Sequence, residues 1–279
     1  MDEVRLLNGL DLFSGIGGIT LALKSWVRPV VYCETDRYAQ SVLLSRMSDG
    51  DLPRAPIWDD VRTLSKETLG ECVDIDIIYG GFPCQDISSA GNGRGMEAGS
   101  RSGLFSEIIR LTEEIRPTFL FLENVPAIRT RGLARVLCEL TAIRYDCRWC
   151  VVSAAELGAP HLRKRWFLLA ANADSYRKRD ERRGKRRKGR ENSPIAIDDG
   201  TESLMAYSDG KRLEGQRAFA CGASKGDQNT PSHHWWSIEP DVGRVANGIQ
   251  FRMDRIKGLG NSVVPAQAKE AFKRLSGLE

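Results

Sequence analysis

The sequence contains no hydrophobic run long enough to cross a lipid bilayer. Its apolar stretches, such as residues 118–122, are far shorter than the roughly 20 residues that a membrane-spanning helix needs. The first residues also lack the basic, apolar and small-residue regions of a secretory signal peptide. We therefore expect a cytoplasmic protein. With 41% apolar and 28% charged residues among 279, the chain suits one large domain and a smaller appendage, and a wholly disordered chain is disfavoured.

Metal-ligating residues are few or badly spaced. The seven cysteines are odd in number and show no disulfide-framework spacing, so reduced thiols are expected in a chain without an export signal. Cys147 and Cys150 form a single CxxC within a predicted strand, which favours buried thiols over the alternative of zinc or redox chemistry. Two adjacent histidines, His233 and His234, have no acidic or thiol partner nearby, so no metal site is predicted.

Net positive charge is concentrated in one segment. Residues 177–190 hold ten basic and two acidic residues, a net charge of +8, so the rest of a chain whose total is +4 carries −4. Such a concentrated field suits a polyanion such as nucleic acid, and a solvated insertion is the alternative.

Apolar runs alternate with helical periodicities over the first 171 residues. The expected strands cover residues 10–13, 30–33, 75–79, 118–122, 148–153 and 166–171, and the expected helices cover 19–26, 36–47, 104–115 and 133–140. This alternation predicts an α/β fold, a Rossmann-like doubly wound and mostly parallel sheet with helices on both faces. The character becomes polar and aperiodic over residues 172–243, and a closing helix is expected from Pro265 to Leu275.

Residues that could take part in binding or catalysis follow the ends of predicted strands, which is where ligands bind in such sheets. The turn Ser14-Gly15-Ile16-Gly17-Gly18 lets a ligand approach the backbone closely, although glycine turns are common. Glu34, after the next strand, strengthens the case because a carboxylate there accepts ribose hydroxyls. The spacing does not fit the GxGxxG pattern that holds a pyrophosphate, which favours a nucleoside cofactor without a diphosphate.

A nucleophile is predicted at Cys84, which Pro83 precedes in a glycine- and serine-rich loop after a buried strand. Most lone cysteines are small buried residues, but this polar loop favours an exposed thiol that acts as a thiolate. Glu123, at the end of the strand 118–122, is either a cap or salt-bridge partner or a proton donor to a heterocycle. Arg163 and Arg165 alternate on one side of an expected extended segment, where they suit a base edge or a phosphate unless they are merely solvated.

Taken together, these motifs resemble those of the cytosine-5 DNA methyltransferases. Five blocks occur in the family's order: Asp11-Leu-Phe-Ser-Gly-Ile-Gly-Gly18, Gly80-Gly-Phe-Pro-Cys-Gln85, Glu123-Asn-Val125, Arg163-Lys-Arg165 and Gly260-Asn-Ser-Val-Val-Pro265. The similarity covers residues 9–171 and roughly 245–279. It implies a class I S-adenosylmethionine-dependent catalytic domain made of residues 1–171 and 245–279, with a basic target-recognition segment at 172–244.

The resemblance also implies roles for individual residues. Catalysis would fall to Cys84, Glu123, Arg163 and Arg165, with Cys84 adding to C6 of a flipped-out cytosine in double-stranded DNA. The S-adenosyl-L-methionine cofactor would be bound by Phe13, Gly15, Ile16, Gly17, Gly18, Glu34, Asp60, Leu104, Asn261 and Ser262. Thr35 stands where the family usually has an aromatic residue.

Two other functions share parts of this pattern. A transfer-RNA cytosine-5 methyltransferase would use the same chemistry on another substrate, and a catalytically silent relative would bind DNA alone. A cognate restriction endonuclease is an open alternative as a partner, and a monomer is the default expectation.

Overall fold

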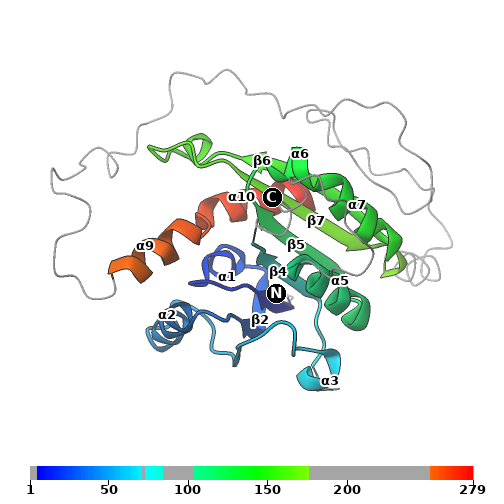
Figure 1. Ribbon diagram of the computed structural model, residues 1–279, viewed down its shortest axis with the longest axis horizontal. Helices are drawn as coiled ribbons and strands as arrows, with labels where there is room; N and C mark the ends of the chain where they lie inside the picture. The colour runs from blue at the N-terminus through cyan, green and yellow to red at the C-terminus, as the bar shows by residue number, and fades with distance from the viewer. Residues whose placement is uncertain (1–4, 71–72, 84–102, 176–251, 279) are drawn as a thin grey trace.

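The computed structural model describes residues 5–70, 73–83, 103–175 and 252–278 (Figure 1). Their centre is a seven-stranded sheet with the order β3-β2-β1-β4-β5-β7-β6. The strands are β1 (Leu7–Leu12), β2 (Val27–Cys33), β3 (Ile57–Trp58), β4 (Ile77–Gly81), β5 (Phe119–Asn124), β6 (Tyr145–Val152) and β7 (Arg165–Asn172). The helices are α1 (Gly18–Leu23), α2 (Arg37–Ser48), α3 (Lys66–Leu69), α5 (Leu104–Ile115), α6 (Ile128–Arg131), α7 (Leu133–Ala142), α9 (Arg252–Asn261) and α10 (Pro265–Ser276).

The sheet confirms the predicted α/β fold. Strands β1 to β5 pair in parallel, whereas β7 runs antiparallel to both β5 and β6. The connection between β6 and β7, residues 153–164, contains only a short 3-10 helix and no crossover helix, so the chain turns back into antiparallel pairing. The strand order reverses between β1 and β4, which is where a doubly wound sheet opens a crevice for ligands.

Helices cover both faces of the sheet because its strands are apolar on both sides. On one face, α5 and α7 pack on the sheet through residues such as Ile108 and Leu140. On the other face, α1 and α10 form a second core with residues such as Leu23 and Phe272. Helix α2 packs on the same side as α1, against Tyr32 of β2. The architecture therefore has three layers.

The closing helix α10 returns to the beginning of the fold. It lies beside α1 in Figure 1, so the orange-to-red helix near the C-terminus contacts the blue helix near the N-terminus. The Phe272 ring lies 5.4 Å from the ring of Trp26 and 5.3 Å from that of Phe121, which it meets edge-on. Val264 and Pro265 begin the helix as predicted, since proline is favoured in the first turn.

Several local expectations are confirmed and others need correction. Asp36 caps α2 by accepting hydrogen bonds from the amides of Tyr38 and Ala39. The two-residue strand β3 and the helix α9 were not predicted, because the first is too short for periodicity and the second is mostly polar. Strand β7 extends to Asn172, one residue beyond the expected boundary. Among the helices of the described ranges, none combines the length and apolar character needed to cross a membrane.

Candidate active site

The loop after β1 and the acid after β2 are joined directly. One carboxylate oxygen of Glu34 accepts the amide of Gly15 at 2.7 Å, and the other accepts the amide of Asp36 at 2.8 Å. Ser14 fastens the same two strand ends, because its hydroxyl donates to the Cys33 carbonyl and accepts from the Cys33 amide. The Glu34 carboxylate is thus fixed at the carboxyl edge of the sheet while its remaining lone pairs stay available for ligand hydroxyls.

The glycines of this loop are required by their surroundings. Gly17 has a φ of 82°, and a β-carbon there would lie 2.4 Å from Leu52. A β-carbon on Gly18 would lie 3.1 Å from Val263, in the segment just before α10. Ile16 lies beside Gly258 of α9, and its carbonyl accepts a hydrogen bond from Arg46. The first and last motifs of the chain therefore meet at one place.

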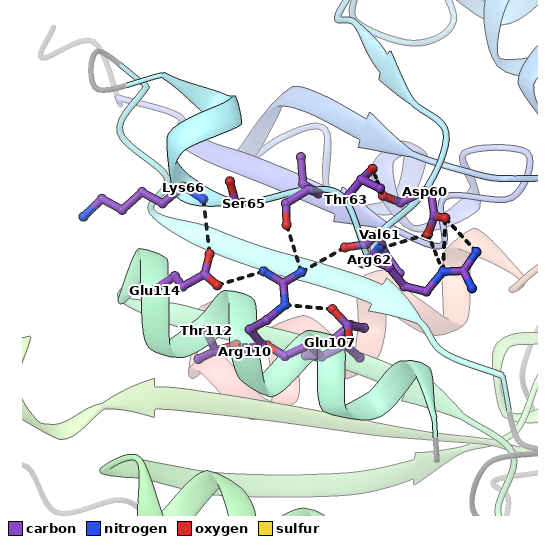
Figure 2. Close-up of polar contacts among 12 residues, drawn as sticks. Asp60, Val61, Arg62, Thr63, Ser65, Lys66, Glu107, Arg110, Thr112 and Glu114 are labelled. Carbon is purple, nitrogen blue, oxygen red and sulfur yellow. Dashed lines mark hydrogen bonds and ion pairs between the residues drawn. The ribbon is translucent and has the colours of Figure 1, made fainter. Parts of the chain in front are cut away.

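Asp60 lies close to Glu34 because β2 and β3 are paired. The Glu34 amide donates to the Trp58 carbonyl at 2.9 Å, two residues before Asp60. In Figure 2, the Asp60 carboxylate is held by the guanidinium and amide of Arg62, with the shortest ion-pair distance at 2.7 Å. This hydrogen bond lowers the pKa of Asp60.

Arg110 of α5 holds the loop that carries Asp60 (Figure 2). Its guanidinium donates to the carbonyls of Val61 at 3.0 Å and Leu64 at 2.8 Å. Two carboxylates of the same helix, Glu107 and Glu114, orient this guanidinium at 2.7 and 2.8 Å. Leu104, at the start of α5, is partly buried and packs against the core that α5 and α7 form with the sheet.

Glu123 and Arg165 form the most distinctive charged pair. Glu123 is the fifth residue of β5 and Arg165 the first of β7, and their side chains meet at 2.9 Å. Burial raises the pKa of Glu123 to about 7, although the positive charges of Arg165 and Arg163 act against that rise. A carboxyl with a pKa near neutrality is suited to donate a proton to a heterocycle. The pair also argues against simple surface solvation of Arg165.

The backbone that leads into Cys84 is anchored beside this pair. Gly81 of β4 lies opposite Glu123, and a β-carbon on it would come within 2.6 Å of the carboxylate. The side-chain amide of Asn124 donates to the Phe82 carbonyl at 3.0 Å. Cys84 itself lies outside the described residues, which stop at Pro83 on this side of the loop.

Arg163 differs from the expected extended residue. Its φ of 23° turns the backbone just before β7, and its guanidinium donates to the carbonyls of Gly260 at 2.8 Å and Ser262 at 2.5 Å. It therefore binds the C-terminal segment instead of lying free beside Arg165. This contact connects the segment of Asn261 and Ser262 to the strand that carries Arg165.

Cys147 and Cys150 belong to different cores on opposite faces of the sheet, so the CxxC thiols do not share a site. Burial raises the pKa of Cys147 to about 12. Gln267 was not predicted as a site residue, yet it is fully buried and contacts the Arg163 backbone. The sequence signal that could have identified Gln267 is a polar residue on the apolar face of the predicted closing helix.

Comparison with known proteins gives a consistent result. Residues 7–236 match the family described as C-5 cytosine-specific DNA methylase. The Type II methyltransferase M.CviJI of Paramecium bursaria Chlorella virus IL3A is 39% identical over 166 residues, which cover 59% of this chain and 43% of that protein. The Type II methyltransferase M2.BsuMI of Bacillus subtilis (strain 168) is 30% identical over 250 residues, which cover 85% of this chain and 61% of that protein.

A solved structure from E. coli, described as a prophage-encoded DNA modification methyltransferase, aligns with a TM-score of 0.50 and 28% identity. The alignment covers 61% of this chain and 48% of that one. The chain thus spans about half the length of the relatives that it matches.

Proposed function

The chain belongs to the C-5 cytosine-specific DNA methylase family, and we propose that it transfers a methyl group from S-adenosylmethionine to C5 of a cytosine in duplex DNA. The ion pair between Glu123 and Arg165 carries this proposal. It lies at the ends of two adjacent strands, β5 and β7, and β4 beside them leads toward Cys84. A protonatable carboxyl, a guanidinium and a thiol are the groups that activation of a cytosine ring requires.

The chemistry begins with a base that has left the duplex stack, because C5 and C6 are inaccessible within it. The Cys84 thiolate adds to C6 while Glu123 donates a proton to N3. Arg165 donates a hydrogen bond to O2 of the ring and keeps the Glu123 carboxyl oriented. Addition of the thiolate makes C5 nucleophilic. After methylation, water takes the C5 proton, the C5–C6 double bond re-forms as Cys84 leaves as the thiolate, and the N3 proton returns to Glu123.

The cofactor would be held by the residues at the carboxyl edge of β1, β2 and β3. S-adenosylmethionine, when bound, supplies a methyl group attached to a sulfonium, and the thioether that remains after transfer is a good leaving group. The carboxylate of Glu34 fits its ribose, because two backbone amides fix the carboxylate without using all of its lone pairs. Asp60 and Leu104 would meet the adenine, Phe13, Ile16 and the neighbouring glycines would line the cleft, and Asn261 and Ser262 would meet the methionine end.

Recognition of DNA is assigned to the segment 172–244, with residues 1–171 and 245–279 as the catalytic domain. Packing of α10 against α1 supports this division, because it joins the two ends of the chain in one core. The basic run 177–190 would contact phosphates, which positions the protein without reading sequence. This run and most of the segment lie outside the described residues.

Transfer of tritiated methyl from S-adenosylmethionine tests the function. We expect label in unmethylated duplex DNA and little in structured RNA. Cys84→Ala should abolish transfer, and Glu123→Gln should lower kcat by about 10²–10⁴-fold. Cys138→Ala, which removes an exposed thiol on α7, is the matched control and should leave the rate unchanged. Preferential labelling of RNA would contradict the DNA substrate, and full activity of Cys84→Ala would contradict the mechanism.

A further inference from the structure

A buried amide connects α10 to the entry of β7. Gln267 lies in the first turn of α10 and is 0% exposed. Its side-chain nitrogen donates to the carbonyl of Val152 at 2.9 Å and to that of Arg163 at 2.7 Å. Within the described part of the chain, its side-chain oxygen has no hydrogen-bond partner. A buried amide that leaves one polar atom unsatisfied is costly, so its two donated bonds should serve a purpose beyond packing.

Arg163 makes the reciprocal connection. Its guanidinium donates to the Gly260 and Ser262 carbonyls, while its own carbonyl accepts from Gln267. The two contacts run in opposite directions between the same two segments, residues 260–267 and the entry of β7. We call this arrangement the Gln267–Arg163 clasp.

The clasp acts on a backbone that would not otherwise hold its conformation. Arg163 has a φ of 23°, which is unfavourable for a residue with a β-carbon, so the surrounding contacts must enforce it. Two residues later, Arg165 begins β7 opposite Val152, the other residue that Gln267 contacts. The Gln267 amide therefore binds both β6, at Val152, and the backbone just before β7, at Arg163, beside the position of Arg165.

We propose that Gln267 is a positioning residue, whose amide fixes the backbone at Arg163 and Val152 so that Arg165 meets Glu123. Its catalytic consequence rests on the proposed function, but its structural consequence does not. No contact of Gln267 with the substrate is involved, and its effect is transmitted entirely through the Arg165–Glu123 pair.

The electrostatics around Glu123 give this role a measurable signature. Among the described residues, the charged groups that act on its carboxyl are Arg165 and Arg163, both carried by the clasped segment. The residue of strand β4 that lies opposite Glu123 is Gly81, which carries no charge. Both arginines lower the pKa of Glu123, so any loosening of the clasp should raise that pKa.

The test is a pH titration of the Glu123 carboxyl by ¹³C NMR of the full chain, with the signal assigned through Glu123→Gln. Gln267→Met keeps the length of the side chain and removes both donors. We expect the pKa of Glu123 to rise on the order of one unit, a partial loss of the effect of an adjacent opposite charge. Gln267→Leu, which also lacks donors, should give the same rise. Ser276→Ala removes a side-chain hydrogen bond at the other end of the same helix, away from the clasp, and should leave the pKa unchanged.

An unchanged pKa in both Gln267 variants, or an equal rise in Ser276→Ala, would overturn the inference. This titration needs no methyl transfer, so it decides the role of Gln267 even if the proposed function fails. In an active enzyme, the alkaline limb of kcat/KM against pH should move upward in Gln267→Met and remain in place in Ser276→Ala. A general loss of rate with no movement of that limb would indicate a merely structural residue.

Discussion

The pH dependence of stability should be governed in part by Asp11, a carboxyl enclosed beneath the glycine turn. Asp11 is 1% exposed, and its carboxylate accepts the Thr20 hydroxyl at 2.6 Å, which is also 2.8 Å from the Tyr79 hydroxyl. Burial raises the pKa of Asp11 from 3.8 to about 8, although the hydrogen bond from Thr20 opposes this. Folded Asp11 is therefore protonated at neutral pH.

The sign of the effect follows from proton binding. Between about pH 4 and pH 8, the folded protein holds a proton on Asp11 that the unfolded chain has released. The free energy of unfolding should therefore fall as the pH rises, with a slope from this group of about 1.4 kcal/mol per pH unit. Asp11→Asn keeps an acceptor for Thr20 and removes the titration. Relative to the wild type, the variant should gain about 2.7 kcal/mol between pH 5 and pH 7.

Urea unfolding at pH 5, 6 and 7 measures this difference directly. Asp36→Asn is the control, because the ion pair with Lys257 lowers the pKa of Asp36. The Asp36 carboxyl is therefore ionised in both the folded and the unfolded protein between pH 5 and pH 7. Its difference from the wild type should stay constant from pH 5 to 7. A constant difference for Asp11→Asn as well would refute the reasoning, since it would mean that the buried carboxyl is charged in the folded protein.

Two other substitutions test the packing that supports the site. Gly80→Ala should destabilise the protein by about 1–3 kcal/mol in thermal unfolding, because its β-carbon would lie 1.9 Å from the Leu12 carbonyl oxygen of the neighbouring strand. A wild-type Tm would contradict that close approach. Arg110→Met should release the loop 61–64 and thereby weaken S-adenosylmethionine binding about tenfold, or about 1.4 kcal/mol. Isothermal titration calorimetry measures this change. Arg135→Met removes a similar ion pair on α7 and should bind normally; equal weakening in both would show that the loop is not involved.

Much of the fold could be predicted because its signals are local. The helix over residues 104–115 was predicted with the bounds that the structure shows, since its apolar residues recur at helical spacing. The Asp36 cap depends only on the next three residues. Gly15 and Glu34 follow strand ends, and Glu123 lies near the end of β5. These positions could be recognised because the carboxyl ends of parallel strands lie at one edge of the sheet.

Other features depended on partners distant in the chain. Strand β3 exists because Tyr32 and Cys33 offer it an edge, and its two residues carry no pattern of their own. The pKa of Glu123 could not be read from its position at a strand end, because burial and the arginines on another strand set it in opposite directions.

The class of fold and the chemical groups at the strand ends can be read from the amino-acid sequence, because periodicity and residue type express them directly. The contacts of those groups depend instead on how distant parts of the chain pack together. Arg163 binds the carbonyls of Gly260 and Ser262, and Gln267 binds that of Arg163, across about a hundred residues of chain. Every residue has a carbonyl, so its presence carries no sequence signal. Which carbonyl a side chain reaches is decided by how β7 and α10 pack together.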